Sequence, residues 1–294
     1  MNTNNFTKSD HMTLPNFLGI GAMRAGTSWL FVQLRNHKDV YISEQKELNF
    51  FNDFYDHGIG WYCSHFPSAK ESAKYRAIGE ITPTYMDDPD AASRIHVHVP
   101  NSRFIVMLRN PVDRAYSEYT KTLRNLNFKG TFDEFIERST GVLERGYYTE
   151  QLERYFRLFS RDQFLCLIFE DAISNHQATI QRLASFLEID PDGFDVNRMK
   201  QTINSSYLPR APRLYSSAVK IRRVLVKRNF GWVPPIAEKI GLISASRYIF
   251  RFRGPRSDLP KMDEKTRKRL NHLYRQEIHN LQKLLAQDLS TWRN

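Results

Sequence analysis

Residues 17–28 of this 294-residue chain read FLGIGAMRAGTS, and the order of residue types in this stretch indicates the architecture. Residues 16–22 have the apolar composition of a short buried strand, and residues 27–36 are typical of a helix. The loop between them has two glycines spaced G-x-x-x-x-G. In such a loop the backbone curls, its N–H groups converge, and the helix N-terminus adds positive potential. The stretch therefore predicts a phosphate-binding loop, with a plain turn from strand to helix as the alternative.

The residues inside this loop favour a short phosphate group over a triphosphate. The lysine that follows the second glycine of a nucleotide-triphosphatase loop is replaced by Thr27. No later apolar strand ends in the aspartate that would hold Mg²⁺. The cation of the loop is Arg24, which is followed by Ala25, Gly26, Thr27 and Ser28. This order suits a 5′-phosphate that carries one transferable group.

Short apolar runs alternate with amphipathic stretches across the first two thirds of the chain. Further strands are expected at 75–81, 103–108 and 163–169, and helices at 89–99, 111–124, 146–160 and 173–187. This rhythm predicts an α/β fold with a P-loop-type central parallel sheet that is flanked by helices on both faces.

We expect one domain over residues 1–294, because no internal repeat or low-complexity tract interrupts the chain. Its expected parts are a flexible N-terminus (1–15), the α/β core (16–190), a basic segment (204–260) and a C-terminal helix (263–287).

A second anion site is indicated after the strand at 103–108. Arg109 follows this strand, and Asn110 and Pro111 suit the N-cap and first position of the next helix. Arg109 would then lie at the carboxyl edge of the sheet, where open α/β folds bind ligands. Ser117, two turns along the helix, would face the same ligand. A structural pairing of Arg109 with a carboxylate is the alternative.

Residues 46–51, KELNFF, supply a candidate base. Glu47 stands beside Lys46 and ahead of two aromatic residues, a mixed cationic and apolar setting that can tune a carboxylate for proton transfer. A surface glutamate without a catalytic role is the alternative interpretation.

Taken together, these stretches resemble the sulfotransferases that use 3′-phosphoadenosine 5′-phosphosulfate (PAPS). The resemblance rests on RAGTS at 24–28, KELNFF at 46–51 and RNPVDRAYS at 109–117. GIGWY at 58–62, GEITPTY at 79–85 and the closing stretch 263–292 extend it over most of the chain. The chain is most similar to the carbohydrate branch, which includes the heparan sulfate sulfotransferases.

The resemblance implies a role for each of the quoted residues. Residues 24–28 would hold the 5′-phosphosulfate of PAPS, and Arg109 and Ser117 would hold its 3′-phosphate. Glu47 would remove the proton from an acceptor hydroxyl or amine as that group attacks sulfur in line, without a metal. Arg24 replaces the usual lysine and would neutralise charge on the leaving phosphate, and Lys46 would assist.

Departures from the branch concern the acceptor. Ile81 stands where heparan-specific relatives carry a substrate-binding lysine, and Asn49 where they carry histidine or glutamine. The C-terminal cysteine pair of the secretory members is missing. We therefore expect a glycan, a glycolipid or a small hydroxylated molecule rather than heparan sulfate itself.

The formal charge of +11 is concentrated in one segment. Residues 207–256 contain twelve basic residues and one acidic residue, so the rest of the chain is balanced. Residues 216–228 form a basic amphipathic helix pattern, typical of contact with an anionic membrane surface or of a docked helix with a solvated basic face. Arg253 and Arg256 lie where relatives carry a loop that closes over PAPS, so they are assigned to cofactor or acceptor.

Other features bound the location and the class of protein. Residues 1–15 are polar and the two cysteines form no pairing pattern, so we expect a cytoplasmic protein, peripheral at a membrane through 216–256. No metal-ligand or RNA-binding motif is found, and no nucleic acid partner is expected.

Two alternative functions stay open. One is a kinase with a degenerate phosphate loop, which would require ATP and Mg²⁺. The other is a non-enzymatic binder of anionic membranes or nucleic acids, which would bind them without PAPS affinity.

Overall fold

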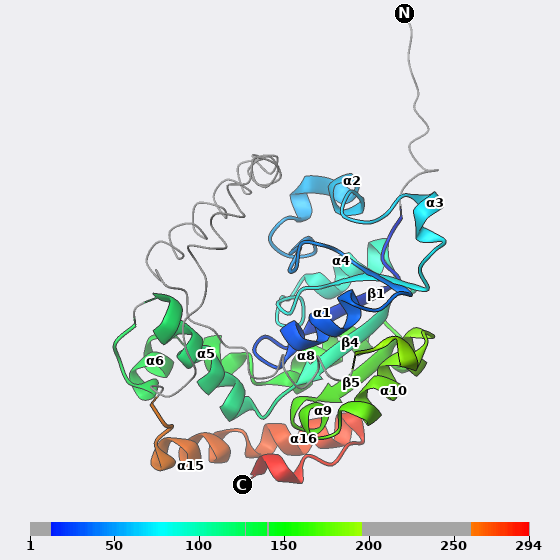
Figure 1. Cartoon of the computed structure of the whole chain (residues 1–294). Coiled ribbons are helices and arrows are strands. Elements are labelled where there is room, and N and C mark those ends of the chain that lie inside the picture. Colours follow the sequence, from blue (N-terminus) through cyan, green and yellow to red (C-terminus); the bar gives the residue numbers. More distant parts are fainter. Residues whose placement is uncertain (1–12, 127, 140, 196–259, 294) are drawn as a thin grey trace, which may run out of the picture.

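The structure is a computed structural model that describes residues 13–126, 128–139, 141–195 and 260–293 (Figure 1). Apart from its last residue, the basic segment 204–260 lies outside these residues, and so do Arg253 and Arg256. The division of the chain into an N-terminus, a core, a basic segment and a C-terminal helix stays a prediction.

A five-stranded parallel sheet forms the centre of the molecule. Its strands are β1 (Phe17–Gly21), β2 (Val40–Ile42), β3 (Ala77–Ile81), β4 (Arg103–Leu108) and β5 (Phe164–Ile168). They lie side by side in the order β2-β3-β1-β4-β5, and every neighbouring pair is parallel. The predicted P-loop-type parallel sheet is confirmed, with β2 as a short strand that the sequence did not indicate.

The strands are almost wholly buried, because both faces of the sheet are covered. All residues of β1 and β3 are buried, as expected for parallel strands with continuous apolar composition. Gly79 is required by a close approach: a Cβ atom there would lie 2.3 Å from the carbonyl oxygen of Phe17. Because Gly79 has no side chain, β3 can pair with β1 while the Phe17 backbone and ring lie close to Gly79.

Helices lie on both sides of the sheet (Figure 1). On one side α1 (Thr27–Arg35) and α10 (His176–Leu187) meet through the stacked rings of Trp29 and His176, whose centroids are 6.1 Å apart. On the other side lie α4 (Ala91–His98) and α8 (Tyr148–Phe156), and His96 of α4 packs against the ring of Phe159, three residues after the end of α8, with the centroids 5.3 Å apart. Right-handed crossovers between parallel strands place these helices on the two faces.

The remaining helices frame the carboxyl edge and the periphery of the sheet. They are α2 (Gly58–Cys63), α3 (Ala69–Ser72), α5 (Pro111–Leu126), α6 (Phe132–Arg138), α7 (Gly141–Glu144), α9 (Phe169–Ser174) and the short turns η1 (Tyr55–His57), η2 (Arg161–Gln163) and η3 (Pro191–Gly193). Within the described ranges no helix is both long enough and apolar enough to cross a bilayer.

The C-terminal part consists of two helices and a turn where one helix was expected at 263–287: α15 (Glu264–Leu273), α16 (Arg275–Leu285) and η4 (Ser290–Arg293). Between the two helices the Tyr274 ring is fully buried, and its hydroxyl donates to the carbonyl of Leu143 at 2.7 Å. The Thr149 hydroxyl donates to Glu277 at 2.8 Å and joins α16 to α8.

Candidate functional site

The candidate site lies where β1 and β4 end side by side. From β1 the chain continues to β2 at one edge of the sheet, and from β4 it continues to β5 at the other edge. Such a switch in strand order leaves a crevice outside the carboxyl ends of the two strands, and open α/β sheets bind ligands there. The loop after β1 carries Arg24, and Arg109 directly follows β4.

The glycine-bounded loop curls as its sequence predicts. Arg24 and Gly26 have φ values of 70° and 96°, in the left-handed region. The N–H of Ala22 donates to the carbonyl of Met107 at 2.6 Å, which fixes the start of the loop to β4. Gly26 is the N-cap of α1, and the first turn of that helix contains no acidic residue. The N-terminus of α1 is therefore directed into the loop as a site of positive potential.

Of the other three predicted loop residues, two are buried beneath the loop and one is exposed. Ala25 is fully buried, and its N–H donates to the carbonyl of Ala22 at 3.2 Å, so it shapes the loop from below. Thr27 is buried as the first residue of α1, whereas Ser28 is exposed. Of these three residues, Ser28 has the side chain that a ligand can reach.

The structure brings Arg24, Ser117 and Arg109 together from three elements. Arg24 donates from Nη2 to the Ser117 hydroxyl at 3.0 Å. Arg109 donates from Nη1 to the carbonyl of Arg24 at 3.4 Å, and its guanidinium lies 4.8 Å from the centroid of the Phe169 ring. The Tyr148 hydroxyl in turn donates to the carbonyl of Arg109 at 2.9 Å. The two predicted cations thus border one space.

Asn110 caps the helix that carries Ser117, as the sequence predicts. Its side-chain oxygen accepts from the N–H of Val112 at 2.9 Å, and Pro111 is the first residue of α5. Its amide group donates to the carbonyl of Trp292 at 3.2 Å. The cap therefore fixes both the start of α5 and the position of the C-terminal turn beneath it.

Lys46 joins the candidate base to the phosphate loop. Its Nζ donates to the Ser28 hydroxyl at 2.7 Å and forms an ion pair with Glu47 Oε1 at 3.1 Å. Half of the Glu47 side chain is exposed, so its carboxylate is accessible from solvent. Glu47 has φ 62°, a left-handed conformation that is unusual for a residue with a side chain. Glu47 and the phosphate loop therefore lie on opposite sides of one cation.

A further cation, Lys121, was not singled out from the sequence. It lies on α5 four residues after Ser117, which places both on the same face of the helix. The pKa of Lys121 is lowered by desolvation and by the positive charge of Arg24, while Glu47 raises it. Helical periodicity counted onward from Ser117 would have identified it. Lys121 adds to a local excess of positive charge around Glu47.

Glu80 was quoted only as part of a motif, yet it is the most buried carboxyl group near the site. Its side chain is 1% exposed, and burial raises its pKa to about 7. The hydroxyls of Thr82 and Tyr85 each donate to it at 2.7 Å, which lowers the pKa against the effect of burial. Nothing in the sequence distinguishes this glutamate from an exposed one, because its burial depends on the surrounding elements.

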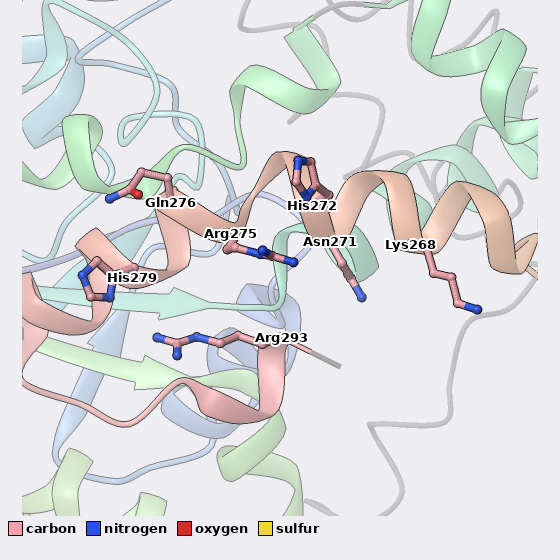
Figure 2. Close-up of a pocket in the computed structure, with 7 residues that line it drawn as sticks. All are labelled: Lys268, Asn271, His272, Arg275, Gln276, His279 and Arg293. Atoms are coloured by element: carbon pink, nitrogen blue, oxygen red, sulfur yellow. The ribbon is translucent and has the colours of Figure 1, made fainter.

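A separate basic pocket of about 820 Å³ lies on α15, α16 and η4 (Figure 2). Arg275 and Arg293 extend into the same space from two of these elements. All lining side chains except Asn271 are exposed, and Lys268 is paired with Glu264 at 2.9 Å. The pocket shares no residue with the phosphate loop or the Glu47 loop, and it is lined by Lys268, Asn271, His272, Arg275, Gln276, His279 and Arg293.

In the described part of the chain, no three His, Cys, Asp or Glu side chains lie close enough to hold a metal ion. The groups that the site offers to an anion are guanidinium, ammonium, hydroxyl and backbone N–H groups. These groups are suited to phosphate and sulfate oxygens.

Together, the sheet order, the loop and the clustered cations define a P-loop-type α/β protein with a candidate anion site at its switch point. The sulfotransferase domain family matches residues 14–213, and the chain belongs to that family.

Sequence relatives are named as sulfotransferases, and one solved structure shares the fold. The chain is 33% identical over 159 residues to the membrane-associated sulfotransferase kil1 of Dictyostelium discoideum, covering 51% of this chain and 33% of that protein. It is 32% identical over 191 residues to the human heparan sulfate glucosamine 3-O-sulfotransferase 3B1, covering 62% and 48%. The chain thus spans a third to a half of the length of these relatives. A sulfotransferase from Alicyclobacillus acidocaldarius shares the fold with a TM-score of 0.67 and 21% identity, over 96% of this chain and 100% of that one.

Proposed function

We propose that the protein transfers the sulfuryl group of PAPS to a hydroxyl or amine of a glycan, a glycolipid or a small acceptor, with Glu47 as the base. One observation carries this proposal: Lys46 contacts both Ser28 of the phosphate loop and the Glu47 carboxylate, at 2.7 and 3.1 Å. A donor phosphosulfate in the loop and an acceptor beside Glu47 would therefore meet at one cation. Membership of the sulfotransferase family supports the same chemistry.

Two sets of residues would bind the two ends of the PAPS donor. Residues 24–28 and the N-terminus of α1 would hold the 5′-phosphosulfate, because the curled backbone and the helix end favour an anion there. Arg109 and Ser117 would hold the 3′-phosphate, since they lie at the adjacent end of β4 and on α5. Arg109 is oriented for this by its contacts with the Phe169 ring and the Arg24 carbonyl.

In the transfer step Glu47 accepts the proton of the acceptor hydroxyl or amine as that oxygen or nitrogen bonds to sulfur. The bond between sulfur and the bridging phosphate oxygen breaks at the opposite side of sulfur. Arg24 and Lys46 neutralise the negative charge that gathers on the departing phosphate. Arg24 keeps its proton throughout, because a guanidinium stays charged at any physiological pH.

An acidic acceptor is favoured by the charge around Glu47. Lys121 interacts with the Glu47 carboxylate, and the pKa of Lys121 is lowered first by desolvation and then by the positive charges of Arg24 and Lys46. A sulfated or carboxylated sugar would balance this excess, and relatives are named for heparan sulfate glucosamine. Ile81 is fully buried, so it offers no contact to such an acceptor. Cytoplasmic location stays a prediction. Membrane contact through residues 216–256 also stays a prediction, because that segment lies outside the described residues.

The test compares Glu47→Gln with Glu44→Gln, which neutralises an exposed acid three residues earlier. Adenosine 3′,5′-bisphosphate should raise the Tm of the wild type and of both variants. Transfer of labelled sulfate from PAPS to a panel of glycan and glycolipid acceptors should fall at least about a hundredfold in Glu47→Gln alone. Full transfer by Glu47→Gln would exclude it as the base. An unchanged wild-type Tm would exclude PAPS as the donor.

A further inference from the structure

Glu80 is a buried carboxylate held by hydroxyl groups. It lies next to the end of β3, and no ion pair joins it to a basic side chain among the residues that the structure describes. Oε1 accepts from the Tyr85 hydroxyl at 2.7 Å and from the Tyr62 hydroxyl at 3.4 Å. Oε2 accepts from the Thr82 hydroxyl at 2.7 Å. Both oxygens of Glu80 thus act as acceptors.

Two of these hydroxyls extend the network to the backbone that follows Glu47. The Thr82 hydroxyl accepts from the N–H of Asn49 at 3.2 Å, and the Tyr85 hydroxyl accepts from the N–H of Phe50 at 2.9 Å. A backbone hydrogen bond from Leu48 reaches Glu80 directly. Three successive N–H groups, from residues 48 to 50, therefore end on one carboxylate, directly or through one hydroxyl.

The backbone held in this way adopts an unfavourable conformation. Glu47 and Asn49 have φ values of 62° and 53°, which residues with side chains adopt rarely. Such conformations persist only where surrounding contacts impose them, and they gather at functional sites. The N–H of Glu47 also donates to the carbonyl of Ile81 at 3.2 Å, so the segment is tied to the end of β3 at several successive residues.

We propose that Glu80 is a positioning residue that fixes the backbone of residues 47–50, in which Glu47 and Asn49 are left-handed, and thereby aims the Glu47 carboxylate at the acceptor. This inference rests on the proposed function, in which Glu47 is the base. The negative charge suits the task, because a carboxylate accepts on both oxygens whereas an amide accepts on one and donates from the other. Burial raises the pKa of Glu80 to about 7, so a neutral side chain would suit the buried position better than the charge does.

The network offers its own matched control. Tyr85→Phe and Thr82→Val each remove one hydroxyl that relays a loop N–H to Glu80. Tyr62→Phe removes a hydroxyl from the same carboxylate, but Tyr62 accepts no loop N–H and its ring stays stacked on Phe50 at 4.5 Å. Glu80→Gln replaces the shared acceptor without changing its size.

The kinetic readout is the separation of kcat from KM. We expect kcat to fall about ten-fold in Tyr85→Phe and Thr82→Val, and at least as far in Glu80→Gln, because a buried hydrogen bond lost from the loop is of that magnitude. The KM for PAPS and the Tm shift with adenosine 3′,5′-bisphosphate should match the wild type, and Tyr62→Phe should retain kcat. Equal losses in Tyr62→Phe and Tyr85→Phe, or an unchanged kcat in both relay variants, would overturn the proposal.

Amide hydrogen exchange at residues 48–50 tests the positioning without any turnover. These N–H groups should exchange about ten-fold faster in Tyr85→Phe and Thr82→Val than in the wild type and in Tyr62→Phe. Unchanged exchange in the relay variants would contradict the proposal. A wild type that transfers no sulfate would refute the proposed function alone, since the exchange result stands independently of it.

Discussion

Ionisation of Glu80 should make the stability of this protein depend on pH in a way that one substitution removes. Burial raises the pKa of its carboxyl group from 4.5 to about 7. The folded protein therefore binds this proton more tightly than the unfolded chain does. The resulting stabilisation is fully present below pH 4.5 and is lost as the pH rises through 7. The Glu80→Gln variant has no titrating group at this position, so its stability should lack this pH dependence.

The size of the effect follows from the pKa shift. One pKa unit corresponds to about 1.4 kcal/mol of differential interaction between the two protonation states. Between pH 5 and pH 8, Glu80 loses its proton in the folded protein, whereas in the unfolded chain it is already mostly ionised. Nearly all of the pKa difference of roughly two and a half units therefore contributes, and the contribution of Glu80 to the free energy of unfolding should fall by about 2 to 3 kcal/mol. The pKa values of Asp87, Glu170 and Glu277 are also raised by burial, but these groups are common to both proteins.

Urea unfolding of the wild type and of Glu80→Gln at pH 5, 6, 7 and 8 measures this quantity. The difference in unfolding free energy, wild type minus variant, should decrease steadily over the series by the stated amount. A difference that stays constant within 0.5 kcal/mol (about the error of such comparisons) would show that Glu80 does not titrate abnormally. The argument that its charge is retained for the Glu47 segment would then lose its energetic basis.

Three further substitutions test the geometry of the site and its support. Arg109→Ala should abolish the Tm increase caused by adenosine 3′,5′-bisphosphate, because charged hydrogen bonds to a phosphate are lost, and a retained increase would remove Arg109 from the anion site. Gly26→Ala should destabilise the protein by about 1 to 3 kcal/mol and weaken the same ligand, since its Cβ would lie 2.6 Å from the Phe169 ring at φ 96°, whereas thermal melts of Gly60→Ala, which has open space around it, should show no loss. Arg114→Leu should cost about 3 to 5 kcal/mol in denaturant unfolding, because the fully buried Arg114 pairs with Glu118 at 2.7 Å, and a loss below 1 kcal/mol would contradict that role.

Much of the fold could be predicted because its signals are local. The strand, loop and helix at 17–28 are encoded by apolar residues, glycines and the start of an amphipathic helix within a few residues of one another. The caps of α5 at Asn110 and Pro111 are equally local, and they place Arg109 at the end of β4. The short strand β2 and the bend at Tyr274 were missed, because pairing with β3 and burial of one ring create them.

In the candidate site, too, some residues could be named from the sequence, whereas their contacts depend on the fold. Arg24, Glu47, Arg109 and Ser117 could be named from motif spacing, since each motif marks the end of a strand or the start of a helix. Their convergence through the Lys46 and Ser117 contacts depends on three segments that are up to 93 residues apart in the chain. Lys121 lies outside the quoted motifs and Glu80 was only one residue of a quoted motif, so the burial and the charges around them are visible only in the tertiary structure.

By itself the sequence determined four of the five strands, the candidate phosphate loop after β1 and the residue types that suit sulfuryl transfer, because these depend on neighbours along the chain. Only the tertiary structure decided which strands are adjacent, which cations share one space, and that a glutamate in an ordinary motif is buried with its pKa raised to about 7. The physical reason is that burial and electrostatic interaction depend on distance in space. Folding brings Glu80, Tyr85 and the Glu47 segment within hydrogen-bonding distance, and no spacing along the chain encodes that contact.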